Sequence, residues 1–157
     1  MTIQQVCTFY LKGSYFGIEI EQVQEIIRQP PLTRIPLAPP DICGLMNLRG
    51  QVIPVVDLPC RLGLRSASCG IGEETTYNVI VNTIDDVISF IVEDIGDILS
   101  CDSETFEPPP ANLTAHIRGF LKGAYKLEQG FLLILDTIKI SDSTKFSDST
   151  LITSSLN

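Results

Sequence analysis

Apolar and polar residues follow one another in short runs along most of the chain, and these runs predict strands. Residues 6–20 hold two runs of β-branched and aromatic residues on either side of Lys12-Gly13-Ser14, a pattern typical of a β-hairpin. Residues 77–92 repeat the arrangement around Asp85-Asp86. The sequence therefore predicts two hairpins that lie far apart along the chain.

The stretch between them, residues 42–58, reads ICGLMNLRGQVIPVVDL. Its two glycines, Gly44 and Gly50, let the backbone turn or approach a neighbour without a Cβ clash. Residues 52–56 predict a strand, and Pro54 places it at a sheet edge or a bulge.

Arg49 lies between that turn and that strand. A guanidinium is costly to bury without a partner. Arg49 is therefore expected either to pair with an acid of its own fold, for example Glu25, or to point at a binding partner.

The remaining segments predict further short elements. Val23, Ile26 and Ile27 stand at helical spacing, which predicts a short helix over residues 21–27, ended by Pro30-Pro31. The other expected segments are an extended connection over 33–40, a long loop over 62–76, strands over 117–122, 124–127 and 131–135, and a flexible Ser/Thr-rich tail over 141–157 that follows a folded region of residues 1–140.

The two halves of the chain resemble one another at an offset of about 72–75 residues. Residues 20–26 match 92–98, residues 42–45 match 117–120, and in both halves a glycine precedes an apolar strand that ends at an aspartate, Asp57 or Asp136. Five short strands in each half cannot safely leave their edges open. An all-β fold of two small five-stranded barrels is therefore expected.

Composition and charge narrow the function classes. The 157 residues are enough for one domain, and the net charge of −8 argues against nucleic acid or an anionic membrane as the main partner. No apolar run approaches the ~20 residues of a membrane span, and the N-terminus lacks signal-peptide features, so a cytoplasmic location is expected. The five cysteines form no C-x-x-C pair, which favours reduced thiols; whether Cys43, Cys60 and Cys69 are redox-active stays open.

Residues that carry catalysis are scarce. The single histidine, His116, stands beside Arg118 and is expected to be solvated or packed rather than catalytic. The glycines form neither a P-loop nor a dinucleotide-binding motif. Asp57 and Asp136 are expected to cap backbone amides at strand ends rather than act as an acid/base pair. The sequence therefore predicts a protein that is not an enzyme and holds no cofactor or metal.

Several of these segments together resemble the CheW family of chemotaxis coupling proteins. They are YFGIEIEQVQEII, RIPLAPP, ICGLMNLRGQVIPVVDL, FIVEDIGDIL, IRGF and GFLLILD, which span about residues 5 to 140. The resemblance implies two SH3-like barrels and an adaptor that binds the regulatory domain of the histidine kinase CheA and the cytoplasmic tip of chemoreceptors.

The same resemblance implies the residues that meet the receptor's helical hairpin, in a groove between the barrels: Val23, Glu25, Ile26, Gly44, Asn47 and Arg49. An apolar stripe on the hairpin would fit a groove lined by Val23 and Ile26, although either residue could belong to a barrel core. Two other functions stay open. One is a CheW-like adaptor of a pilus-motility or other alternative pathway, and the other is a small-molecule-binding double barrel.

Overall fold

A computed structural model describes residues 2–65 and 76–141 of the chain. Most of the loop predicted over residues 62–76 lies outside these ranges, and so do Cys69 and all but the first residue of the predicted tail. The end of the folded region near residue 140 stays a prediction.

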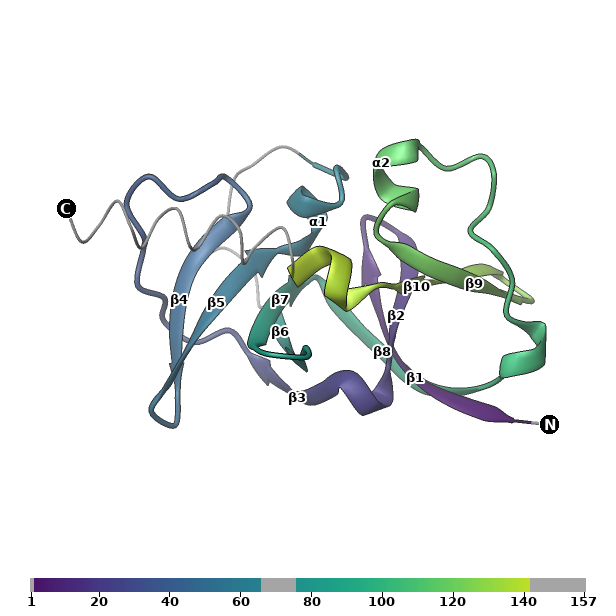
Figure 1. Cartoon of the computed structure of the whole chain (residues 1–157), viewed down its shortest axis with the longest axis horizontal. Coiled ribbons are helices and arrows are strands. Elements are labelled where there is room, and N and C mark those ends of the chain that lie inside the picture. Colours follow the sequence, from purple (N-terminus) through teal and green to yellow (C-terminus); the bar gives the residue numbers. More distant parts are fainter. Residues whose placement is uncertain (1, 66–75, 142–157) are drawn as a thin grey trace.

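Within these ranges the chain forms strands joined by very short helical turns (Figure 1). The first half contains β1 (Ile3–Leu11), β2 (Ser14–Glu19), η1 (Ile20–Gln22), β3 (Val23–Arg28), β4 (Ile42–Leu48), β5 (Gln51–Asp57) and α1 (Leu58–Arg61). The second half contains β6 (Tyr77–Asn82), β7 (Val87–Val92), β8 (Asp94–Asp102), η2 (Ser103–Thr105), α2 (Ala115–Arg118), β9 (Leu121–Leu127) and β10 (Gly130–Leu135). The all-β prediction is confirmed.

The strands form two five-stranded sheets that exchange strands between the halves of the chain. Sheet A has the order β8-β1-β2-β10-β9, and sheet B has the order β3-β6-β7-β5-β4. Each sheet contains the hairpin of one half and three strands of the other. One strand of each hairpin makes a parallel pair with the other half, β2 with β10 or β7 with β5. The other strand makes an antiparallel pair, β1 with β8 or β6 with β3. The two sheets were expected, but neither is built from one half alone.

The two halves of the described chain contain equivalent strands in the same order, and one of the predicted residue matches is wrong. β1–β2 corresponds to β6–β7, β3 to β8, and β4–β5 to β9–β10. The match of residues 42–45 with 117–120 is wrong, because 42–45 lie in β4 and 115–118 form α2. Residues 121–124 correspond to 42–45 instead: Leu45 forms a bridge with Thr33, and Ala124 forms the equivalent bridge with Glu107.

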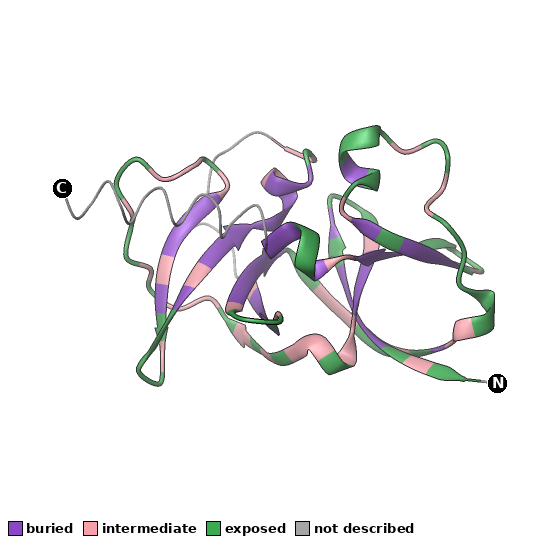
Figure 2. Cartoon of the chain, in the orientation of Figure 1, coloured by how far each residue is buried: buried purple, intermediate pink, exposed green. Residues whose placement is uncertain are grey.

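Inner strands of both sheets are buried on both faces (Figure 2). Along β10, Leu132 and Ile134 belong to a core inside sheet A, whereas Leu133 and Leu135 belong to a larger core shared by the two sheets. Strand β7 divides its side chains in the same way between the shared core and a core inside sheet B. This double burial explains why these strands are nearly continuous apolar runs rather than alternating ones.

The predicted helix over residues 21–27 is wrong. Only residues 20–22 form a helical turn, and Val23–Arg28 is strand β3, which pairs with β6. Short apolar runs satisfy the spacing of a helix and of a strand alike, and here pairing with β6 decides between them.

The strand predicted over 117–122 begins only at Leu121. Thr114 precedes the helical turn α2, and its hydroxyl accepts a hydrogen bond from the backbone N–H of Ile117 at 3.4 Å. This contact is an N-cap, which starts a helix where the sequence analysis placed a strand.

Pro54 lies in β5, which is an inner strand of sheet B, and the bulge of this hairpin lies in β4. The predicted edge or bulge position is therefore wrong. Leu45 lies opposite Pro54 in β4, but its backbone N–H donates to the Thr33 carbonyl and its carbonyl accepts from the Thr33 N–H, both at 2.8 Å. On the other side of β5, pairing with β7 begins only at Val55. Pro54 is thus tolerated because no neighbouring strand requires an N–H at that position.

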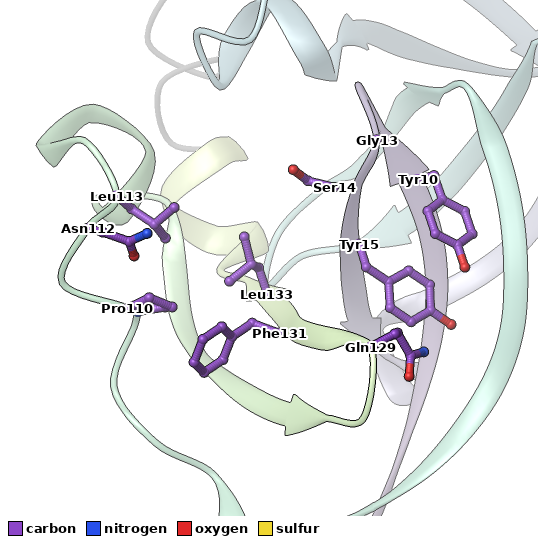
Figure 3. A pocket seen from close by; sticks show the side chains of 10 residues that line it. All are labelled: Tyr10, Gly13, Ser14, Tyr15, Pro110, Asn112, Leu113, Gln129, Phe131 and Leu133. Carbon is purple, nitrogen blue, oxygen red and sulfur yellow. The ribbon is translucent and has the colours of Figure 1, made fainter.

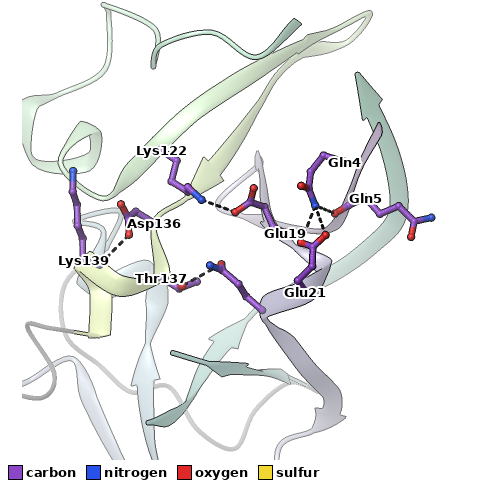
Figure 4. A network of polar contacts seen from close by, with 9 residues as sticks. Gln4, Gln5, Glu19, Glu21, Lys122, Asp136, Thr137 and Lys139 are labelled. Atoms are coloured by element: carbon purple, nitrogen blue, oxygen red, sulfur yellow. Dashed lines mark hydrogen bonds and ion pairs between the residues drawn. The ribbon is translucent and has the colours of Figure 1, made fainter. Parts of the chain in front are cut away.

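The segment that crosses from sheet A to sheet B is held by polar side chains (Figure 4). Lys122 Nζ lies 2.6 Å from Glu19 Oε1, and Gln4 Nε2 donates to both carboxylate oxygens of Glu21 at 2.9 Å. Thr137 Oγ1 donates to Gln22 at 3.1 Å. These contacts fix the point from which β3 starts.

Gly44 and Gly50 differ in what a side chain would meet. A Cβ on Gly44 would lie 2.5 Å from the carbonyl oxygen of Thr33, whereas a Cβ on Gly50 would meet nothing within 4 Å. Both residues have positive φ. We predict that Gly44→Ala lowers the free energy of unfolding by about 3 kcal/mol through strain and overpacking, and Gly50→Ala by about 1 kcal/mol through strain alone. Urea unfolding measures both, and equal losses would contradict the close backbone approach.

Candidate functional site

A two-residue turn joins β4 to β5 and presents Arg49. Arg49 and Gly50 have φ values of 51° and 88°, as in a type I′ turn, which requires positive φ at both central residues. Asn47 Oδ1 accepts a hydrogen bond from the Gly50 backbone N–H at 2.9 Å and so stabilises the turn. An arginine is an unusual residue in the left-handed conformation, and a residue held in such strain is a reason to look for a function.

The Arg49 side chain reaches across sheet B to Glu25. β3 and β4 are the two edge strands of this sheet, and we call the gap between them the seam. Arg49 Nη1 donates to Glu25 Oε1 at 3.3 Å, and Nη2 donates to Oε2. The Arg49 side chain is 65% exposed and that of Glu25 27%. The hydrogen bond from Arg49 lowers the pKa of Glu25 below its ordinary value. The two roles proposed for Arg49 are therefore compatible: it has an internal partner and still faces solvent.

A bulge in β3 places Val23 and Ile26 on one face. The pairing with β6 shifts between Val23 and Glu25, so that Val23 lies opposite Val81 and Ile26 opposite Val79. Both valines of β6 belong to the shared core, so this face of β3 turns toward sheet A. Val23 packs against that core, while Ile26 is 37% exposed at its margin. Of the two apolar residues predicted for the groove, Ile26 is the more accessible.

Gly44 is buried, in contrast to Asn47 and Arg49. Its backbone lies against Thr33, and its Cα hydrogen occupies space that a side chain would need. Gly44 therefore does not contact a partner directly. It can contribute to binding only by setting the position of β4 and of the β4–β5 turn.

Ile98 is a candidate that the sequence analysis did not single out. It lies on β8 opposite Cys7, which in turn pairs with Ile18 of the shared core. The Ile98 side chain is 58% exposed. Ile98 corresponds to Ile26 in the internal repeat, so the repeat itself could have pointed to it. The two isoleucines lie on the edge strands of opposite sheets, each on the face that carries shared-core residues.

The two aspartates at strand ends cap backbone amides, as predicted. Asp57 Oδ1 accepts from Cys60 N–H at 3.3 Å, and Asp136 Oδ1 accepts from Lys139 N–H at 3.1 Å (Figure 4). Only Asp57 is fully buried, and Arg65 Nη2 donates to both of its carboxylate oxygens at 2.7 Å.

His116 lies in α2, on the side that faces α1. Its Nε2 is 3.0 Å from the Arg61 carbonyl oxygen, and its ring lies edge-on against Phe120 with centroids 5.4 Å apart. His116 is nevertheless exposed, and its imidazole reaches from α2 to the backbone of α1. Among residues 2–65 and 76–141, no group of three or more His, Cys, Asp or Glu side chains is arranged to hold a metal ion. Over the same ranges no helix has the length and apolar character needed to cross a bilayer.

Comparison with known proteins gives consistent matches. Residues 5–145 match the CheW-like domain family. The chain is 31% identical over 137 residues to "Chemotaxis protein CheW" of Treponema pallidum, which covers 87% of this chain and 81% of that protein. It is 30% identical over 141 residues to the Bacillus subtilis protein of the same name, with 90% and 88% covered. "Protein PilI" of Pseudomonas aeruginosa is 24% identical over 124 residues, with 79% and 68% covered.

The fold matches a solved structure as well. The scaffolding protein TtCheW from Thermoanaerobacter tengcongensis superposes with a TM-score of 0.75 at 28% identity, over 87% of this chain and 86% of that one.

The contact between Arg49 and Glu25 predicts a pH effect. Because the folded-state pKa of Glu25 is lowered, the pair stabilises the fold above the ordinary glutamate pKa of about 4.3, and this contribution is lost as the pH falls through the folded-state value. In Arg49→Asn the pKa of Glu25 should rise toward its ordinary value. NMR titration of the Glu25 side chain measures it, and an unchanged pKa would contradict the ion pair.

The two capping aspartates should differ in their contribution to stability. Asp57→Ala leaves the Arg65 guanidinium without its buried partner and should cost about 3 kcal/mol or more. Asp136→Ala removes only a cap and should cost about 1 kcal/mol. Chemical denaturation of the two variants compares them, and a larger loss for Asp136→Ala would refute this assignment.

Proposed function

The chain belongs to the CheW-like family, and from this we propose that it is a non-catalytic adaptor that couples chemoreceptors to a CheA-type histidine kinase. The match to the family over residues 5–145 carries the proposal. An adaptor needs separate surfaces for its two partners and no reaction chemistry. We assign the receptor to the surface around β3 and the β4–β5 turn.

The apolar residues of that surface suit a helical partner. Ile26 is exposed beside the shared core, and Ile98 occupies the equivalent position on β8. A helix docks in a groove by inserting apolar side chains from one face. Each helix of a helical hairpin has an apolar face. In a groove bordered by β3 and β8, one helix would contact Ile26 and the other Ile98. This assignment adds Ile98 to the residues that the family resemblance implies.

Arg49 supplies the polar part of the same surface. It is held by the type I′ turn and by Glu25, so little side-chain freedom remains to be lost on binding. Its exposed guanidinium can still donate hydrogen bonds to an acidic or carbonyl group of the receptor. We therefore assign direct contacts to Ile26, Asn47 and Arg49, and supporting positions to Val23, Glu25 and Gly44.

An alternative pathway uses the same architecture. The chain is also similar to Protein PilI, whose name does not refer to chemotaxis. An adaptor of a pilus-motility pathway would use the same two classes of partner. Titration against each kinase and receptor pair of the source genome decides between the pathways, since the cognate pair should bind more tightly.

The test is a pair of titrations of the whole protein by calorimetry, one with the regulatory domain of a CheA-type kinase and one with a receptor cytoplasmic-tip fragment. We predict saturable binding to both. Arg49→Glu should weaken receptor binding at least about 30-fold, as loss of a central interface arginine does, and leave kinase binding unchanged. A folded protein that binds no such kinase would contradict the coupling role.

Arg49→Asn separates a binding role from a structural one. Asn-Gly is the preferred sequence for a type I′ turn, so this variant should unfold at the same temperature or on the order of 2 °C higher, and yet lose receptor binding. Receptor binding that survives in Arg49→Asn would show that the turn matters and the guanidinium does not.

A further inference from the structure

Leu37 has the most exposed large apolar side chain of the described residues, with 92% of its surface accessible to solvent. Other exposed apolar residues have ordered neighbours. Tyr10 stacks on Tyr15 with ring centroids 4.6 Å apart. Tyr10 and Phe131 also border an open pocket at one end of sheet A (Figure 3), although they lie on opposite faces of that sheet. Leu37 is not among the residues of this pocket.

The backbone at Leu37 is unusual as well. The Ala38 N–H donates to the Ile35 carbonyl at 3.3 Å, which closes a four-residue turn with Pro36 and Leu37 at its centre. Leu37 has a φ of 64°, and a positive φ at this position is typical of a type II turn, which favours glycine there. The leucine is therefore strained, and its exposed side chain gains no packing in return. Such strain is a reason to look for a contact outside the described residues.

The turn that carries Leu37 is held in place. Side chains on either side of Leu37 pack against the shared core. Asp41 forms an ion pair with the buried Arg61, and Arg61 Nη1 also donates to the Ile140 carbonyl at 2.8 Å. One guanidinium thus joins the connection between β3 and β4 to the end of the described chain.

Residues 142–157 start at this same point, because Ser141 follows Ile140 and is the last described residue. Leu37 lies four residues before Asp41, which places it at most about 14 Å away. Phe146 lies five residues after Ser141, a stretch that spans up to about 17 Å. Phe146 can therefore reach Leu37.

The two segments are complementary in character and in charge. Phe146 is the single aromatic residue after Ile140 and lies between two copies of S-D-S-T, so that Asp142 and Asp148 flank it. Arg34, three residues before Leu37, is exposed and forms no ion pair with another described residue. An aromatic residue between two carboxylates thus matches an apolar residue beside a cation.

We propose that residues 142–157 fold back on the connection between β3 and β4, with the Phe146 ring on the Leu37 side chain and an aspartate beside Arg34. Most of this segment lies beyond residues 5–145, which match the family. β4 runs from the connection to the turn that presents Arg49, so the contact lies at the opposite end of sheet B. The segment therefore covers Leu37 and leaves the proposed receptor surface open.

The experiment uses tryptophan fluorescence of the full chain. The sequence contains no tryptophan, so Phe146→Trp introduces a single reporter. A tether of a few residues gives an effective concentration in the millimolar range, which populates a weak contact in about half of the molecules. Acrylamide should therefore quench Phe146→Trp about twofold less efficiently than Phe146→Trp/Leu37→Gly. Equal quenching would overturn the proposal. Glycine suits the turn, and circular dichroism checks that both variants are folded.

Ile138 supplies the matched control, because it lies in the helical turn of residues 137–141 and is 39% exposed. In the Phe146→Trp protein, Ile138→Ala should leave the quenching unchanged. If Ile138→Ala exposes the tryptophan and Leu37→Gly does not, the segment packs on its own helical turn and the proposal is wrong. Arg34→Glu should raise the quenching, and so should added salt; no effect of either would contradict the charge contact.

Two further measurements separate this contact from other associations. The quenching of Phe146→Trp should not change on dilution, whereas a contact that is lost on dilution would identify a second copy as the occupant and overturn the proposal. Leu37→Gly should bind the receptor fragment like the wild type. A failed receptor titration would therefore contradict the proposed function and leave this contact standing.

Discussion

Burial of both faces of the inner strands is the constraint on which this structure depends. β7 and β10 each supply side chains to the core of their own sheet and to the core that the sheets share. Neither sheet can therefore be displaced without exposing the shared core. The exchange of strands also holds the two halves of the chain together, because each hairpin pairs with strands of the other half. As a result, the edge strands β3 and β8 hold fixed positions and can present a binding surface.

Local sequence patterns predicted the parts of the fold that local interactions decide. Both hairpins were predicted because β-branched runs flank a short turn, and the aspartate caps because a carboxylate ends an apolar strand. The β3 segment was mistaken for a helix because Val23, Ile26 and Ile27 fit helical spacing, and only pairing with β6, more than fifty residues later, decides for a strand. Strand exchange has the same cause: the repeat shows that the halves are alike but not which hairpin pairs with which strands.

At the candidate site, too, some contacts could be anticipated from the sequence and others depend on the path of distant segments. The sequence analysis named Glu25 as a possible partner of Arg49, and the two side chains do meet across the seam. It did not indicate that Gly44 is buried against Thr33, because that contact depends on the path of a proline-rich connection. It also passed over Ile98, although the internal repeat places this residue level with Ile26. The contact between Glu25 and Arg49 was thus anticipated, whereas the burial of Gly44 and the position of Ile98 were not.

The central claim is that the Arg49 guanidinium itself contacts the receptor, with Glu25 holding it in position. The most direct measurement is receptor-fragment binding by the charge-swapped double variant Glu25→Arg/Arg49→Glu, beside each single variant. The swap keeps an ion pair across the seam and moves the positive charge to β3. The account predicts that the double variant regains the stability of the wild type but does not bind the receptor. Recovery of receptor binding in the double variant would contradict it, because the ion pair alone would then be what the receptor requires.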